Sequence, residues 1–222
     1  MSSELQKKRE REAEQQKLKR RRDVVKAALT LFNEKGIEAS SIQEIADRAE
    51  IGVASVYRYF SNKGELAVEA AILNWQNGYT PLTEAASKSP TGAEKLKTIL
   101  DGFLQLFREN PDFFRYLEDF DNFISRLPKR PEAMARYEQV LAENDRVEDG
   151  VLEEGIADGS LKDLPNLHAL FSISGLAVTA LAQKLLNRGH ITSRDEQFDP
   201  EVQLRMLIET LLDNILVDKD GK

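Results

Sequence analysis

The chain has 222 residues, of which 41% are hydrophobic and 31% charged, with no cysteine and a formal net charge of −7. This length provides for one or two domains with a buried core, and the composition is that of a soluble globular protein. The lack of cysteine excludes disulfide bonds and thiolate metal sites, and it fits a cytoplasmic location. No apolar run approaches the ~18–20 residues that a membrane span needs, and no signal peptide follows Met1.

Charge is unevenly distributed along the chain. Residues 1–64 hold 14 lysines and arginines against 10 acidic residues, whereas residues 65–222 hold 17 against 28. The basic part includes a polar segment over residues 4–22 that ends in the cluster Lys19–Arg22. Two interpretations of this segment stay open: a solvated helical extension, or a basic arm that contacts a nucleic-acid backbone or minor groove.

Helical periodicity recurs almost throughout the chain, and no convincing strand is found, so we expect an all-α fold. A first helix is predicted from Arg22 to a stop at Gly36. Ser41 and Glu44 form an S-x-x-E capping box before a short second helix, and a third short helix follows a break at residues 50–52. Longer helices are predicted over residues 62–79, 92–110, 111–127, 131–159, 165–189 and 200–217.

The second and third short helices, joined by a tight turn, predict a helix-turn-helix. One arc of the third helix is expected to pack against the preceding helices, and it holds Val53, Val56, Tyr57 and Phe60. The other arc is expected to enter a major groove of DNA, and it holds Ala54, Ser55, Arg58 and Tyr59. Lys63 lies in the first turn of the next helix. A cation there interacts unfavourably with the helix dipole, at a cost of roughly 0.3–1 kcal/mol. A bound phosphate would offset that cost, and a solvated surface lysine is the alternative.

The stretch Val24–Leu66 resembles the DNA-binding domain of the TetR family of bacterial regulators. The run Val56–Phe60 followed by Lys63 is the most specific part, and the other matching residues are Ala28, Leu31, Phe32, Gly36, Ser41, Ile42, Ile45, Ala46, Ala49 and Leu66. The resemblance implies a homodimeric repressor that a small apolar or amphipathic effector releases from its operator. It also implies phosphate contacts by Ser41, Tyr57 and Lys63, and base or backbone contacts by Val53, Ala54, Ser55, Arg58 and Tyr59.

The implied organisation has three segments: a basic N-terminal extension over 1–21, a DNA-binding domain over 22–66, and an effector-binding and dimerisation domain over 67–222. The turn of the helix-turn-helix departs from the family pattern. A glycine is usual where this chain has Glu50, and a left-handed conformation there would cost ~1–2 kcal/mol. A serine or threonine cap is usual where the chain has Gly52.

The helices predicted over 165–189 and 200–217 are apolar on more than one face. One face serves the core of the subunit, and the second predicts a two-fold four-helix interface between two copies. The residues assigned to this interface are Phe171, Val178, Leu181, Ile208, Leu212 and Ile215.

Aromatic residues are concentrated in the middle helices. Those assigned to a candidate effector pocket are Trp75, Phe103, Phe107, Phe120, Phe123 and Tyr137. An aromatic stripe at helical spacing is also typical of plain core, so a DNA-binding or partner-binding helical dimer without an effector stays open as the alternative. A roomy pocket would favour the effector, and a closed middle domain would favour the alternative.

No motif for catalysis is found, because the chain has no nucleophile elbow, phosphate loop or metal-ligand cluster. Its two histidines, His168 and His190, are far apart in sequence. We therefore expect no enzymatic activity, no cofactor and no metal. The expected partners are double-stranded operator DNA, a second copy of the chain and a possible small-molecule effector, and not a membrane.

Overall fold

The computed structural model describes residues 2–188, 191 and 197–217, and these contain ten helices. In chain order they are α1 Ser2–Lys35, α2 Ile42–Arg48, α3 Val53–Tyr59, α4 Lys63–Gly78, α5 Thr80–Ala86, α6 Gly92–Glu109, α7 Asp112–Ser125, α8 Met134–Ala157, α9 Leu167–Arg188 and α10 Pro200–Ile215. The described residues hold no strand, only an isolated antiparallel bridge between Leu161 and Leu216. The all-α prediction is confirmed.

The chain divides into two compact units. Unit 1 comprises Met1–Asn74 and Asp119–Tyr137, and unit 2 comprises Trp75–Glu118 and Glu138–Lys222. Unit 1 therefore contains α1 to α3, most of α4, the second half of α7, and the segment that leads from α7 into the first turn of α8. Unit 2 contains α5, α6, α9, α10 and most of α8. The functional boundary at residues 66 and 67 stays a prediction.

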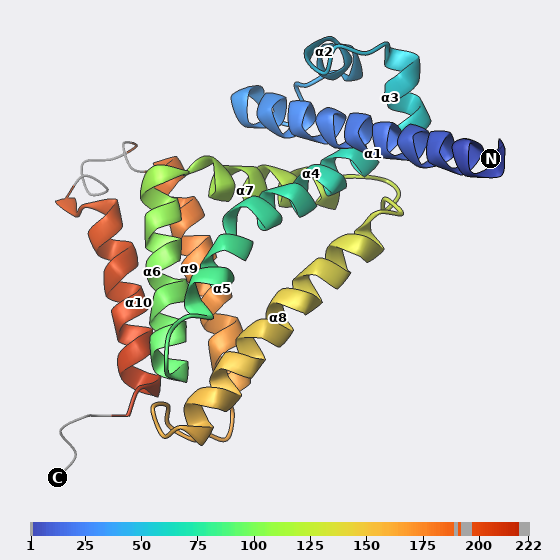
Figure 1. The fold of residues 1–222 in the computed structure, drawn as a ribbon. Helices are drawn as coiled ribbons and strands as arrows, with labels where there is room; N and C mark the ends of the chain where they lie inside the picture. Colours follow the sequence, from blue (N-terminus) through green and yellow to red (C-terminus); the bar gives the residue numbers. More distant parts are fainter. Residues whose placement is uncertain (1, 189–190, 192–196, 218–222) are drawn as a thin grey trace. The chain divides into compact units, whose positions relative to one another are not determined.

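The second half of α1 supplies much of the core of unit 1. Val24, Ala28 and Phe32 recur at every fourth position and are at most 2% exposed. α2 and α3 both pack against α1 (Figure 1), and each contributes a fully buried side chain, Ile45 and Val56. α1 begins at Ser2, well before the predicted start at Arg22. The predicted start marks the point where the apolar stripe begins, and the helical form expected of the solvated extension over residues 4–22 is confirmed.

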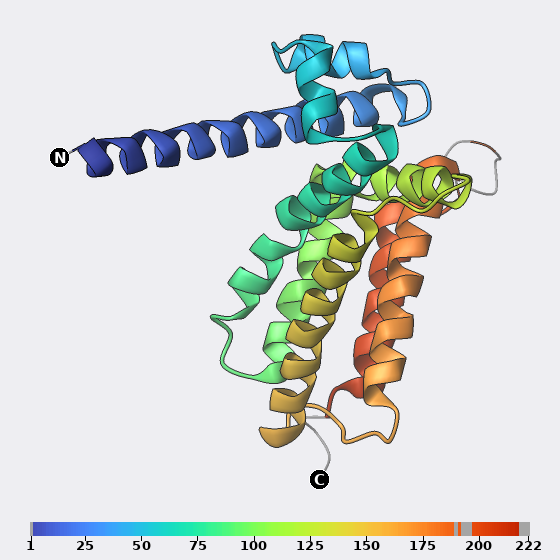
Figure 2. The ribbon, with the colours of Figure 1, turned by 90° about the vertical axis from the view of Figure 1, so that its right-hand side faces the viewer.

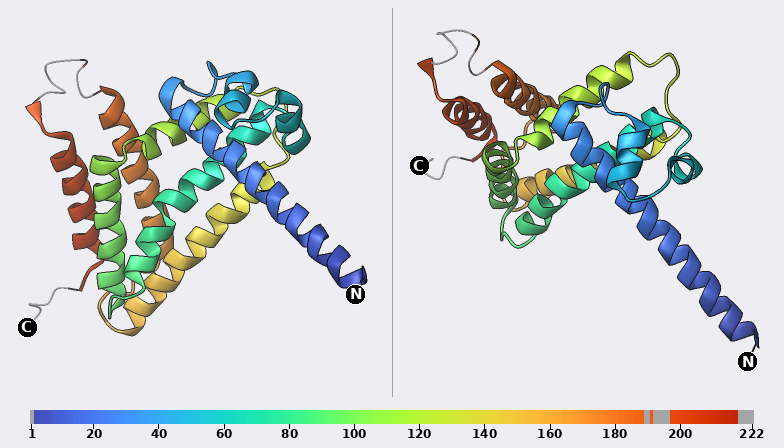
Figure 3. Two further views of the ribbon diagram at one scale, coloured as in Figure 1. Left: turned by 45° about the horizontal axis from the view of Figure 1, so that its top comes forward. Right: turned by 90° about the horizontal axis from the view of Figure 1, so that it is seen from above.

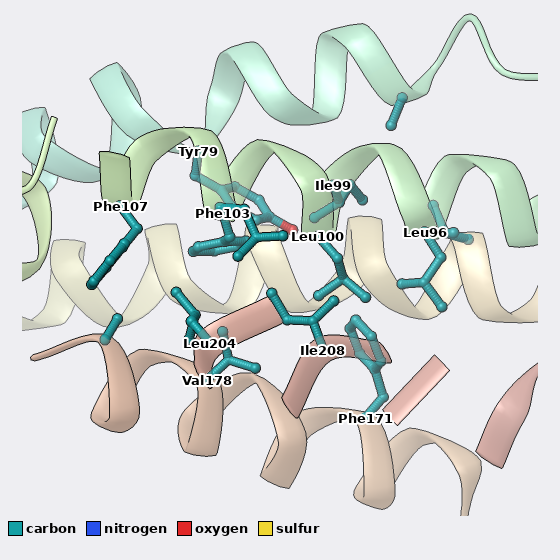
Figure 4. Close-up of a cluster of buried hydrophobic side chains, with 14 of the residues drawn as sticks. Tyr79, Leu96, Ile99, Leu100, Phe103, Phe107, Phe171, Val178, Leu204 and Ile208 are labelled. Atoms are coloured by element: carbon teal, nitrogen blue, oxygen red, sulfur yellow. The ribbon is translucent and has the colours of Figure 1, made fainter. Parts of the chain in front are cut away.

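α6 is the central helix of unit 2. It packs against α5 and α10, and α10 in turn packs against α9 (Figures 1 and 2). Leu96, Ile99 and Phe103 lie on its inner side and are buried (Figure 4). α5 was not predicted, because Pro81 indicated a break in the chain, whereas the structure places it in the first turn of α5.

α9 contradicts the expectation that no segment is long and apolar enough to cross a membrane. It has 22 residues and a mean hydropathy of 1.5 over an 18-residue window, of which 22% is buried. Length and composition of one helix are weak evidence for a membrane span. The inner side of α9 packs in unit 2 through Phe171 and Val178, whereas Ile173 and Leu176 are exposed.

Candidate nucleic-acid interface

Side chains fix the start of α2. The Oγ of Ser41 accepts the Glu44 N–H at 3.2 Å, and the Glu44 carboxylate accepts the Ser41 N–H at 3.0 Å. The predicted capping box is therefore confirmed. The Lys35 ammonium, 2.5 Å from Glu44, and the Ser41 hydroxyl lower the pKa of Glu44 to about 2. These contacts hold α2 to the end of α1.

The turn between α2 and α3 contains a strained residue. Glu50 has φ +54°, in the left-handed region that favours glycine. Gly52 does not take over this conformation, because its φ is −72° and it serves as the extended N-cap of α3. The departure from the usual turn sequence therefore leaves the strain on Glu50, at a cost of ~1–2 kcal/mol.

One side of α3 is anchored in unit 1 and the other is uncovered. Val56 is fully buried and Phe60, directly after the helix, is 4% exposed, whereas Tyr57 is 53% exposed. Tyr57 therefore does not belong to the packing arc in which the helical geometry placed it. The reason is that so short a helix is anchored by one pair four residues apart. The other residues predicted to face DNA are exposed or partly covered: Val53, Ala54, Ser55, Arg58 and Tyr59.

Arg58 lies at the end of this uncovered side. Its Nη2 donates to the Ser55 Oγ at 3.1 Å, and its guanidinium carbon lies 5.7 Å from the centre of the Tyr59 ring. Within the described part of the chain, Arg58 has no carboxylate at salt-bridge distance. Most of its five donors therefore remain available to an acceptor outside the chain.

Lys63 is bound by the chain itself. Its Nζ donates to the carbonyl oxygens of Glu38 at 2.8 Å and Ser40 at 3.1 Å, and it lies 5.6 Å from the centre of the Phe123 ring. These two bonds use two of the three donors of the ammonium, and the phosphate contact of Lys63 stays a prediction. Asp119 holds the same loop, because its Oδ2 accepts the Ile37 N–H at 2.7 Å.

A hollow of about 340 Å³ adjoins the end of α3. It is lined by Arg21, Tyr57, Arg58, Tyr59, Phe60, Ser61, Glu65, Glu69 and Glu132. Glu69 is buried and forms ion pairs with Arg21 at 2.8 Å and with Arg136. Sequence reasoning missed this cluster. The available signal was an acidic residue inside the otherwise apolar stretch 66–72.

The segment that carries this uncovered helix matches a known family. Residues 24–70 match the model described as bacterial regulatory proteins, tetR family. These residues form a DNA-binding domain of the TetR type. The match includes all of α2 and α3 and the first half of α4.

Two curated relatives and one solved structure extend this result. The chain is 35% identical over 66 residues to the probable HTH-type transcriptional regulator YttP of Bacillus subtilis, and the match covers 30% of this chain and 31% of YttP. It is 27% identical over 146 residues to the HTH-type transcriptional repressor KstR2 of Mycolicibacterium smegmatis, covering 64% and 68%. The transcriptional regulator FadR from Bacillus subtilis, solved in complex with stearoyl-CoA, shares the fold with a TM-score of 0.59 and 19% identity over 86% and 96% of the two chains.

The residues assigned to the dimer interface lie mostly in the core of unit 2. Those that are 2–8% exposed are Phe171, Val178, Ile208 and Ile215, and Leu181 and Leu212 are partly buried. A side chain that its own subunit covers cannot form a second surface, so these four residues are corrected to core residues, whereas Leu181 and Leu212 stay predictions. The apolar side chains that α9 and α10 expose are Leu170, Ile173, Leu176, Val202 and Met206.

The aromatic residues assigned to the effector pocket are divided between the two units. Trp75, Phe103 and Phe107 belong to unit 2, whereas Phe120, Phe123 and Tyr137 belong to unit 1. Inside unit 2 the rings pack against other rings. The ring centres of Trp75 and Phe113 are 5.4 Å apart, and those of Phe103 and Phe114 are 6.3 Å apart. Phe103 and Phe107 thus contribute to a filled core (Figure 4), as the plain-core interpretation predicts.

Unit 2 also has a cavity of about 230 Å³, lined by Asp145, Glu148, Asp149, His168, Phe171 and Ser172. The Tyr79 hydroxyl donates to Glu148 at 2.6 Å. Burial, and then the charges of Asp145 and Asp149, raise the pKa of Glu148 to about 7, against the lowering effect of the Tyr79 hydrogen bond. The Nδ1 of His168 lies 2.5 Å from the Oδ1 of Asp149. His190 lies outside the described residues.

Proposed function

We propose that this chain is a transcriptional repressor of the TetR family that binds operator DNA as a homodimer through α3. The observation that carries the proposal is the uncovered side of α3, where Tyr57 and Arg58 are exposed on a helix that Val56 and Phe60 anchor. A major groove admits one helix, and an arginine with available donors suits guanine or phosphate. The names of YttP and KstR2, a transcriptional regulator and a transcriptional repressor, support this function.

A second copy of the chain is the partner proposed for the uncovered side of α9. Leu170, Ile173 and Leu176 are 38%, 66% and 72% exposed, and Met206 of α10 is 61% exposed. Exposed apolar patches of this kind mark contact surfaces, and a two-fold axis would present the same patch twice. Two α3 helices would then meet successive major grooves, with half-sites about 34–36 Å apart or a multiple of that distance.

A small apolar or amphipathic effector is proposed to release the DNA by shifting the population of chain conformations. The support is the FadR structure, whose ligand is stearoyl-CoA, and the cavity of about 230 Å³ beside α8 and α9. The expected result is that at least one compound of this class lowers operator affinity and raises the melting temperature of the chain. Compounds that bind without changing operator affinity would contradict the proposal.

The alternative, a DNA-binding or partner-binding dimer without an effector, has its own support in unit 2. The aromatic rings of its core pack in contact, and the apolar cavity lined by Leu100, Phe171 and Val178 measures only about 10 Å³. In either case we infer binding and no catalysis, as the names of the relatives suggest. We also infer a cytoplasmic location, since the operator is bacterial chromosomal DNA.

Selection of bound duplexes from a random pool tests the proposal. The expected result is enrichment of a two-fold symmetric sequence by the full chain, and a loss of that enrichment in Arg58→Ala. Recovery of unrelated sequences only, with no shared half-site, would contradict sequence-specific binding.

A further inference from the structure

We propose that residues 4–22 of α1, here named the basic arm, bind the phosphate backbone of duplex DNA next to the operator. This inference rests on the proposed function and adds a second DNA-contacting surface to unit 1. The basic arm holds nine lysines and arginines against four glutamates. Figure 3 shows the first turns of α1 extending beyond α2 and α3 in unit 1.

The basic arm has few contacts that would stabilise it as a helix. Every side chain from Gln6 to Arg20 is exposed. Within the described part of the arm, the ion pairs between its own residues are Lys8–Glu12 at 3.9 Å and Glu14–Lys17 at 3.7 Å, both long and solvent-exposed. A helix that is polar all round gains little from burial, so binding to a polyanion would supply the missing stabilisation.

Arg21 fixes the position of the arm relative to α3. Its guanidinium pairs with buried Glu69 at 2.8 Å and lies 4.9 Å from the centre of the Phe60 ring. Arg21 also lines the same hollow as Tyr57 and Arg58. The end of the arm is therefore next to the end of α3, and both belong to unit 1.

The cations around Arg21 are available for an external partner. Lys17, Lys19, Arg20 and Arg22 are exposed, and in the described structure the last three have no ion-pair partner. Residues 65–222 carry 28 acidic against 17 basic residues, so most of the remaining chain is a poor match for phosphate. A polyanion bound here must come from outside, and the adjacent α3 favours DNA over RNA or an anionic membrane.

The length of the arm sets how much DNA it can cover. A helix of this size spans about 28 Å, which corresponds to about eight base-pair steps at 3.4 Å. A duplex that ends at the operator would therefore lack the phosphates that the arm contacts, and a duplex extended by about ten base pairs on each side would provide them.

The test compares two charge variants of the full chain. The arm variant carries Lys17→Gln, Lys19→Gln, Arg20→Gln and Arg22→Gln. The matched control carries Lys88→Gln, Lys97→Gln, Arg146→Gln and Lys184→Gln, which remove the same charge from exposed positions of unit 2. Fluorescence anisotropy measures the affinity of each for the selected duplex with and without flanks, and for a random-sequence duplex, between about 50 and 200 mM salt.

The expected result is specific to the arm. Its variant should lose the affinity gained from the flanks, and its slope of log K against log salt should fall by about 2–4, since each lost phosphate contact contributes about 0.9. The ratio of affinities for the selected and random duplexes, measured without flanks, should stay as in the parent chain, because that ratio reports on α3. The control variant should keep both the flank effect and the salt slope.

Three outcomes would overturn the inference. Equal changes in the arm and control variants would mean a bulk charge effect. An unchanged arm variant, with DNA binding that Arg58→Ala still weakens, would reject the arm and leave the proposed function in place. Binding of the arm to single-stranded RNA or to vesicles of anionic lipid, without any effect of the flanks on duplex binding, would assign it to another partner.

Discussion

α3 and α9 both leave one side uncovered, but the two sides differ in chemistry. On α3 the uncovered side carries Tyr57 and Arg58, whereas on α9 it carries Ile173 and Leu176. A polar, donor-rich side loses little by facing water and gains by meeting phosphates and bases. An apolar side gains by being removed from water. The difference supports the proposal that the chain has two contact surfaces, for partners of opposite character.

The largest expected effect comes from making the side of α9 charged. Ile173→Asp together with Leu176→Asp should weaken self-association by roughly 10⁴-fold or more, because burying four such side chains per dimer contributes about 1.5–3 kcal/mol each. Light scattering coupled to size exclusion measures the mass. Gln105→Asp with Gln139→Asp adds the same charge at exposed positions of α6 and α8 and should stay dimeric. A dimeric Ile173→Asp/Leu176→Asp variant would place the interface elsewhere.

A change of pH should alter the stability of unit 2 through Glu148 of α8, which lines a cavity together with Phe171 of α9. The pKa of Glu148 is raised to about 7 in the folded chain, so between pH 4.5 and 7 the folded state holds more protons than the unfolded state. The free energy of unfolding of unit 2 should therefore fall by about 3 kcal/mol as the pH rises through this range. In Glu148→Gln this fall should disappear in urea unfolding, whereas Glu153→Gln, exposed on the same helix, should retain it.

Removing the Arg58 side chain tests whether the uncovered side of α3 contacts the operator. Arg58→Ala should lower affinity for the selected operator by about 10–100-fold, since a good arginine–base contact is worth about 1–3 kcal/mol. The mass of the dimer should not change. Arg205→Ala removes an exposed arginine from α10 and should leave operator affinity intact in the same gel-shift series. Equal losses of operator affinity in the two variants would mean that Arg58 of α3 does not contact the operator specifically.

The smallest expected effect concerns the turn that presents α3. Glu50→Gly should raise the free energy of unfolding by up to about 1 kcal/mol, because removing the left-handed strain outweighs the added flexibility of glycine. Glu50→Ala keeps a Cβ in the same conformation and should show no such gain. The midpoints of thermal unfolding measure both. A destabilised glycine variant would mean that the Glu50 side chain contributes more than its strain costs.

Local features of unit 1 were predictable from the sequence. The capping box needs only Ser41 and Glu44 at the right spacing, and the stop at Gly36 needs only a residue that accepts positive φ. The helical form of the first half of α1 was expected, but its continuity with the helix from Arg22 was not, because apolar periodicity was the signal used and that segment has none. The hydrogen bonds of Lys63 were not predictable, because its partners, the carbonyls of Glu38 and Ser40, come from a loop about 25 residues earlier.

In unit 2 the sequence did not reveal which side of a helix faces the core. Residues 167–182 of α9 carry one apolar stripe with Phe171 and Val178 and another with Ile173 and Leu176, and composition does not tell which one faces the core. For the aromatic residues, the sequence also did not reveal which unit each one belongs to. Phe103 and Phe123 have similar helical surroundings in sequence, yet they belong to different units because the chain crosses between units within α7.

Hydroxyl-radical oxidation of side chains, read by mass spectrometry with and without the selected duplex, tests the difference between α3 and α9 in one measurement. The account predicts that DNA strongly reduces oxidation of Tyr57, which is 53% exposed in the free chain. It also predicts that Ile173 and Leu176 are protected equally with and without DNA, because a second copy covers them. Protection of Ile173 and Leu176 by DNA, with Tyr57 oxidised as before, would contradict the account.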